Sequence, residues 1–138
     1  MSDAATAFLD HWHRIVAEKD LEALADILAD DVRIGAPPYW QKLQGHALVH
    51  HLLGLIIHTI EDFVYHREWL NDRELALEFK GHVGEEDLQG IDLITLDERG
   101  LVRNIDVLMR PVNSVITLRE IISPQMAAFL AKASEVSD

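Results

Sequence analysis

Cysteine is absent from this sequence of 138 residues. A disulfide bond, a thiolate zinc site and a cysteine nucleophile are therefore excluded. The N-terminal segment MSDAATAFLDHWHR also lacks the basic stretch and long apolar run of a signal peptide. These features suit a protein of the reducing cytoplasm, and the length suits one domain over residues 1–138.

Positive charge is scarce, because 12 basic residues stand against 24 acidic ones and the net charge is −12. Such a surface repels nucleic-acid backbones and anionic membranes, so we expect neither as a partner. The most apolar window, ALVHHLLGLIIHTI, is too short to span a bilayer and contains three histidines. The seven glycines are dispersed and form no phosphate loop, so we expect no cofactor.

Apolar residues recur at helical spacing in three segments. Residues 4–18 carry an apolar stripe that includes Phe8 and Trp12. A short second helix is expected after Asp20, a residue type that favours the N-cap position, and its stripe runs to Leu28. A third helix, apolar on most of its circumference and therefore largely buried, is expected between Gly45 and Ile60.

The remaining pattern is that of strands and turns. The stretch DVRIGAPPYW predicts a strand that ends at Pro37 and Pro38. From Phe63 to Met109 the period changes to two, and the turn-forming segments NDRE, GEED and DERG divide this region. The predicted strands are residues 63–70, 74–83, 87–97 and 101–110. They form an antiparallel meander.

The C-terminal segment is predicted not to form one continuous helix. Residues 113–122 fit a helix or irregular structure, and Ser123-Pro124 predicts the start of a final helix over residues 124–133. Helices, one strand, a helix and then antiparallel strands indicate an α+β fold with the helices on one side of a sheet. A sheet that curls around them encloses a space, with a pocket expected at its mouth.

Three stretches over residues 4–122 carry a resemblance to a known superfamily. They are KDLEALADILADDVRI, LQGHALVHHL and GIDLITLDERGLVRNIDVLMRP. In order and spacing the sequence resembles the nuclear transport factor 2-like, or SnoaL-like, cone-shaped α+β barrels, which include ketosteroid isomerase and limonene epoxide hydrolase. The resemblance implies a cystatin-like cone, a homodimer formed through the sheets, and a small, mostly apolar ligand inside.

The resemblance also implies where ketosteroid isomerase chemistry would fall. The general base at the end of the first strand falls on Ala36, which has no proton chemistry. The tyrosine of the first helix falls on Trp12, whose indole donates a hydrogen bond without useful acidity. The acid on a later strand falls on Asp92 and is kept. We therefore expect no steroid isomerisation by that mechanism.

Limonene epoxide hydrolase implies a second arrangement, in which aspartates are paired around an arginine. Asp92 and Asp106 lie on the last two strands. Asp106 shares a strand face with Asn104, whereas Val107 and Met109 occupy the more apolar face. We expect Asp106 to point away from Asp92, which leaves this arrangement incomplete as well.

Asp92 is the candidate catalytic residue, because the strand GIDLITL places it on an apolar face with Ile94. A buried, unpaired carboxylate costs several kcal/mol or takes up a proton. In one interpretation, the carboxyl group has a raised pKa and offers a proton or hydrogen bond to a ligand oxygen. In the other, it is structural and pairs with backbone N–H groups or with Arg67, Arg103 or Arg110.

Large apolar side chains on the expected inner face and on the loop after the first strand are the candidate ligand-binding residues. They are Trp12, Tyr39, Trp40, Ile94, Ile105, Val107 and Met109. For Trp12, simple core packing remains an alternative. The loop aromatics could instead pack against a partner subunit.

The histidines of the third helix raise the question of a metal. His46 and His50 share one helix face, as two metal ligands can, and His51 and His58 share another. The sequence provides no identifiable third ligand, so we expect no metal site and interpret these residues as partly buried histidines.

These observations predict a homodimer that binds a small hydrophobic molecule, with Asp92 assisting isomerisation, cyclisation or hydrolysis as an acid. The alternatives are a non-catalytic ligand-binding module and a dimerisation or protein-interaction domain with a filled interior. The absence of a base at Ala36 favours the non-catalytic module.

Overall fold

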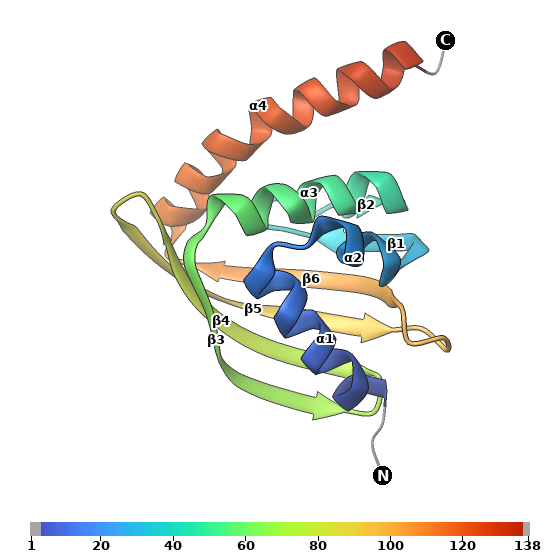
Figure 1. Ribbon diagram of the computed structural model, residues 1–138. Helices are drawn as coiled ribbons and strands as arrows, with labels where there is room; N and C mark the ends of the chain where they lie inside the picture. Colours follow the sequence, from blue (N-terminus) through green and yellow to red (C-terminus); the bar gives the residue numbers. More distant parts are fainter. Residues whose placement is uncertain (1–3, 137–138) are drawn as a thin grey trace.

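The computed structural model describes residues 4–136 and shows helices gathered against one curved sheet (Figure 1). The elements are α1 Ala4–Glu18, α2 Leu21–Asp26, β1 Leu28–Gly35, β2 Leu43–Gln44, α3 His46–Thr59, β3 Glu61–Asn71, β4 Glu74–Val83, β5 Glu86–Leu96, β6 Val102–Arg110 and α4 Val112–Val136. The predicted α+β class is confirmed. The ends of the predicted domain, residues 1–3 and 137–138, lie outside the described residues.

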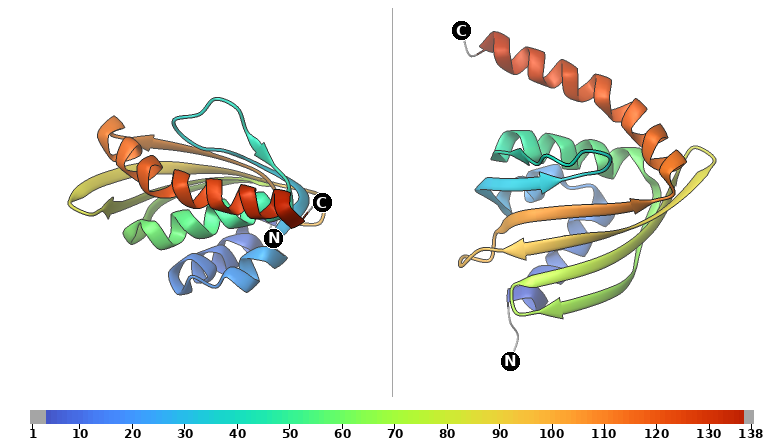
Figure 2. Two further views of the ribbon diagram at one scale, coloured as in Figure 1. Left: turned by 90° about the horizontal axis from the view of Figure 1, so that it is seen from above. Right: turned by 180° about the vertical axis from the view of Figure 1, so that it is seen from behind.

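The six strands form one sheet in the order β2-β1-β6-β5-β4-β3. Strands β3 to β6 are the predicted antiparallel meander, and β1 joins it parallel to β6. The sheet curves strongly but does not close, so that one face is concave (Figure 2). This is the cone-like arrangement that the resemblance implies.

The first helices cover the concave face for the reason the sequence predicts. Helix α1 buries the stripe that includes Phe8, Trp12 and Ile15. The Asp20 side chain caps α2 by accepting a hydrogen bond of 3.1 Å from the Ala23 amide.

None of the helices within residues 4–136 has the length and apolar character needed to cross a bilayer.

Inward-facing strand residues complete the core, and Gly90 allows one of them, Phe79, to pack closely. Leu77 and Phe79 of β4 are almost fully buried. Phe79 lies directly over Gly90 of β5, where a Cβ atom would stand 2.5 Å from the phenyl ring. Only glycine therefore allows the ring of Phe79 to lie flat against the neighbouring strand.

The start of β1 differs from the prediction. The helical stripe was expected to continue to Leu28, but α2 ends at Asp26 and β1 begins at Leu28. Leu28 lies opposite Val102 of β6, and the Val102 amide donates a 2.8 Å hydrogen bond to the Ile27 carbonyl. Long-range pairing therefore overrides the local helical pattern. The two-residue strand β2 was not predicted.

The prediction of a break at Ser123-Pro124 is wrong, because α4 is one continuous helix with Pro124 inside it. A proline in a helix interior removes one hydrogen bond and costs roughly 3 kcal/mol. Pro124 is exposed, while Leu118 and Ile122 are buried and Met126 packs against the same core. Apolar packing before and after Pro124 offsets the lost hydrogen bond.

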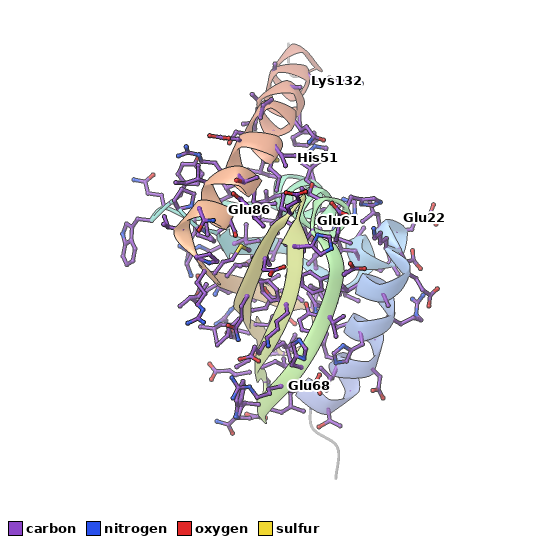
Figure 3. All side chains as sticks on the ribbon, turned by 90° about the vertical axis from the view of Figure 1, so that its left-hand side faces the viewer. Glu22, His51, Glu61, Glu68, Glu86 and Lys132 are labelled. Carbon is purple, nitrogen blue, oxygen red and sulfur yellow. The ribbon has the colours of Figure 1, made fainter. Side chains whose placement is uncertain are left out.

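Helix α4 is fastened near both ends. Ser114 donates a 2.6 Å hydrogen bond to the Asp87 carbonyl, and Thr117 donates a 2.5 Å bond to Glu86 in the β4–β5 hairpin. Figure 3 shows Glu86 near the base of α4 and Lys132 near its far end. Farther along, Phe129 stacks on His51 of α3 at 4.1 Å. These contacts hold α4 against α3 and the β4–β5 hairpin.

Candidate functional site

Asp92 lies on the concave side of the sheet, in the middle of β5. Its cross-strand partners are Leu77 of β4 and Val107 of β6, and side chains of such partners point to the same face. Asp92 is 8% exposed, whereas its neighbour Leu93, on the convex face, is 40% exposed. The alternation in GIDLITL therefore describes the strand correctly.

Two further side chains form a hydrogen-bonded chain with Asp92. The Tyr65 hydroxyl of β3 donates a 2.8 Å hydrogen bond to Asp92 Oδ2. The Trp12 indole of α1 donates a 2.9 Å hydrogen bond to the same hydroxyl oxygen. Trp12 is 2% exposed, so its N–H group depends on Tyr65 for a partner.

Burial raises the pKa of Asp92 to about 7, and the hydrogen bond from Tyr65 acts in the opposite direction. Burial, followed by the nearby Asp92 charge, raises the pKa of Tyr65 well above its usual value, so the phenol keeps its proton. Near neutral pH the Asp92 carboxyl group is thus close to half protonated. The carboxyl group can therefore act either as a hydrogen-bond donor or as an acceptor.

The second oxygen of Asp92, Oδ1, is the one that Tyr65 does not occupy. Oδ1 accepts no hydrogen bond from any described residue. Within the described chain, no fully buried side-chain nitrogen or oxygen lacks a partner, so Oδ1 has accessible space beside it. Because Oδ2 accepts from Tyr65, a proton on Asp92 resides most favourably on Oδ1 and can be donated there.

The structural interpretation of Asp92, in which it pairs with an arginine, is not what the structure shows. Arg67 pairs with Glu78 on the convex face, and none of the ion pairs among the described residues includes Asp92. The partner of Asp92 is a neutral phenol. The carboxyl group therefore lacks a countercharge, which is why burial dominates its pKa.

An apolar cavity of about 450 Å³ opens between α3, α4, β6 and the loop of residues 36–42. Its lining residues are Ile34, Ala36, Pro37, Tyr39, Gln41, Leu43, Leu52, Ile56, Val107, Met109, Val115, Leu118, Arg119, Ile122, Ser123, Met126, Ala127 and Leu130. This volume is typical of sites for small organic molecules. The cavity occupies the mouth of the cone.

Asp92 is not among the lining residues of the cavity, and its link to the cavity is Val107. Val107 lines the cavity and lies directly opposite Asp92 in the β5–β6 ladder. The inner end of the concave face, beyond Asp92, is filled by aromatic rings. Phe63 stacks on Phe79 at 4.7 Å, and Tyr65 meets Phe63 edge-on at 5.0 Å. On the concave face, β5 with Asp92 thus lies between β4, which carries Phe79, and β6, which carries the cavity-lining Val107.

The structure separates the candidate ligand-binding residues into two groups. Tyr39, Val107 and Met109 line the cavity, together with Ala36. The others do not line it: Trp12, Ile94 and Ile105 are core residues, and Trp40 is 95% exposed. Trp12 is held in the core by its bond to Tyr65, whereas Trp40 is exposed on the loop that follows the two prolines.

Tyr65 and the residues of α4 were missing from the predicted site. Tyr65 lies on β3 beside a register shift between Tyr65 and Arg67, which interrupts the period of two. The signal that could have indicated it is the alternation of Phe63 and Tyr65 before that shift. Arg119 was missed because residues 113–122 were predicted as a helix or irregular structure, and Ser123 because it was interpreted as the start of a final helix.

Asp106 points away from Asp92, as predicted. It lies opposite Leu93 on the convex face. Lys42 Nζ is 3.1 Å from Asp106 Oδ1, and Asn104 donates a 3.1 Å bond to Oδ2. The paired-aspartate arrangement of limonene epoxide hydrolase is therefore not formed.

The α3 histidines bond to the backbone. His46 contacts the Ala25 carbonyl at 2.7 Å, and His50 contacts the Leu21 carbonyl at 2.7 Å. His58 contacts the Gly54 carbonyl at 2.9 Å. Among the described residues, no three His, Asp or Glu side chains are grouped as metal ligands would be. The contacts of His46 and His50 join α3 to α2, whereas the contact of His58 lies within α3.

Comparison with known proteins shows the family. A steroid delta-isomerase from Pseudomonas aeruginosa is 32% identical over 95% of this chain and 97% of its own, with a TM-score of 0.87. A cystatin-like-fold protein from Silicibacter pomeroyi is 35% identical over 85% of this chain and 83% of its own, with a TM-score of 0.81. The chain belongs to the nuclear transport factor 2-like superfamily, whose ketosteroid isomerase-like members share this cone.

More distant structures share the fold alone. A nuclear transport factor 2-like protein of unknown function from Burkholderia xenovorans is 17% identical over 77% of this chain and 81% of its own, with a TM-score of 0.63. No protein-family model matches the sequence, and no curated protein matches it.

The Asp92→Asn variant tests the buried acid through stability. Because the pKa of Asp92 is raised from 3.8 to about 7, the stability that it contributes is fully present below pH 3.8 and is lost as pH rises to about 7. At about 1.4 kcal/mol per pKa unit, that loss is roughly 4 kcal/mol. The amide keeps an acceptor for Tyr65 and does not ionise.

We therefore expect the free energy of unfolding of Asp92→Asn, relative to the native protein, to rise by about 2–4 kcal/mol between pH 4 and pH 8. Urea unfolding at both pH values measures it. Asp106→Asn, which removes an outward carboxylate, serves as the control and should leave the native pH trend in place. An Asp92→Asn variant that loses stability at pH 8 would show that the carboxylate is favourably paired.

Proposed function

We propose that this protein binds a small, largely apolar organic molecule in the cavity beneath α4. The observation that carries the proposal is the apolar cavity of about 450 Å³, whose wall includes Val107 opposite Asp92. The similarity to a steroid delta-isomerase supports a ligand with a comparable apolar body. In this proposal Asp92 is the polar group that a ligand oxygen meets at the inner end of the cavity.

Asp92 acts in this proposal through Oδ1. When protonated, Oδ1 donates a hydrogen bond to a carbonyl, hydroxyl or epoxide oxygen of the ligand, while Tyr65 holds Oδ2. A donor in an apolar site is effective because little water competes with it. The Trp12 indole fixes the Tyr65 hydroxyl and so orients the donor without touching the ligand.

The same residues restrict the chemistry. Ala36 lines the cavity at the position where ketosteroid isomerase has its base, so the described lining provides no base there. Acid-assisted isomerisation, cyclisation or hydrolysis therefore needs a base from the ligand itself or from water. The second candidate function, binding without turnover, is favoured by this one observation.

Blocking the cavity tests the proposal. Met126 lines the cavity, whereas Gln125, its neighbour on α4, is exposed. We expect Met126→Trp to weaken the binding of Nile red and of a panel of cyclic ketones and epoxides about tenfold or more, because the larger side chain occupies ligand space. Fluorescence titration and calorimetry measure the affinities.

Gln125→Trp adds the same ring outside the cavity and should bind as the native protein does. If no member of the panel binds, or if both tryptophan variants bind equally well, the cavity is not a ligand site. Turnover of any ligand that binds is then compared in Asp92→Asn, which should abolish an acid-assisted reaction but leave simple binding.

We also propose that two copies pair through the convex face of the sheet. Cross-strand neighbours on this face include Trp69, Leu93 and Leu108, which are 50%, 40% and 55% exposed. Two of the charge pairs beside them are internal to the chain, since Arg67 bonds to Glu78 and Lys42 to Asp106. A second copy would cover the apolar residues without leaving these charges unpaired.

Leu108→Glu tests this pairing. A charge at the centre of the proposed contact has to be buried without a partner, so the variant should be monomeric at concentrations where the native protein is a dimer. Sedimentation equilibrium measures the mass. Ile116→Glu, on α4 and 38% exposed, is the control and should stay dimeric. A native protein that sediments as a monomer contradicts the pairing.

A further inference from the structure

The polar residues of the cavity lie at its rim and come from two facing elements. Tyr39 and Gln41 belong to the loop of residues 36–42, and Arg119 and Ser123 belong to α4. All four are exposed, while the apolar lining residues Ile34, Leu118 and Ile122 lie in the core. The cavity therefore has an apolar interior and a polar opening.

Arg119 gives this opening a positive charge. It is the one charged residue among the described lining residues, and none of the ion pairs or hydrogen bonds of the described chain involves it. Arg119 and Ser123 are one helical turn apart, so both project from the same face of α4. Their guanidinium and hydroxyl groups are donors that have no acceptor in the described chain.

This placement is unusual for so acidic a chain. The protein has 24 acidic residues against 12 basic ones, yet no carboxylate is among the described lining residues. Two other arginines are neutralised by acidic residues, since Glu78 pairs with Arg67 and Asp20 pairs with Arg14. Arg119 differs from the remaining arginines of the described chain because it lines the opening of an apolar cavity.

We propose that the ligand of this cavity is a small organic carboxylic acid, with its apolar body under α4 and its carboxylate on Arg119 at the rim. The inference rests on the proposed ligand-binding function and specifies its ligand class. A guanidinium group binds a carboxylate through two parallel hydrogen bonds, and Ser123 or Gln41 can donate a third. Among the described lining residues, no carboxylate opposes an anion at this position.

A matched pair of ligands tests the inference. Decanoate and 1-decanol share one apolar chain and differ in the charge of the head group. We expect the native protein to bind decanoate about tenfold more tightly or better, because the charged head forms charge-assisted hydrogen bonds. Raising the salt concentration should weaken only the binding of decanoate. Displacement of Nile red, with calorimetry, gives both affinities.

Arg119→Gln should remove the preference by weakening decanoate to the level of 1-decanol, with 1-decanol unchanged. Arg119 is exposed on α4, so the variant is expected to fold normally. Arg103→Gln removes an exposed cation of β6 that does not line the cavity, and it should keep the preference.

The outcomes separate this inference from the function on which it rests. If 1-decanol binds as tightly as decanoate to the native protein, or if Arg119→Gln and Arg103→Gln behave alike, the carboxylate assignment is wrong while the cavity remains a ligand site. If neither compound binds to the folded native protein and Nile red does not bind either, the proposed function is wrong together with the inference.

Discussion

The carboxyl group of Asp92 is the constraint on which the inner half of the structure depends. It is buried on the concave face without a countercharge, and such a group is tolerated only when it is largely neutral or hydrogen-bonded. Tyr65 supplies the hydrogen bond and Trp12 supports Tyr65. Three elements distant in sequence, α1, β3 and β5, are thereby joined at one point.

The concave face of the sheet has a packed part and an open part. Beyond Asp92 the rings of Phe63 and Phe79 fill the cone. On the other side α4 stands away from β6, held by Ser114 at one end and by Phe129 at the other, and leaves the cavity beneath it.

Much of the fold could be predicted from the sequence because its signals are local. The period of two places Asp92 inward and Asp106 outward, the apolar stripe of α1 predicts its buried face, and the apolar circumference of α3 predicts its burial. Pro124 misled the prediction, since a local helix-breaking signal is outweighed by packing on residues far away. Tyr65 was not predicted because a register shift interrupts the period of two on β3. The cavity was not predicted because it depends on the path of α4, which no local pattern specifies.

The most direct test of the account is the titration of the Asp92 carboxyl group in the native, ligand-free protein. Selective ¹³C labelling of aspartate and nuclear magnetic resonance resolve its carboxyl carbon as pH is varied, with Asp92→Asn providing the assignment. The account predicts a midpoint near the pKa of about 7 that burial imposes. A midpoint near the ordinary pKa of 3.8 would mean that Asp92 is solvated or paired as a carboxylate, and would contradict the account.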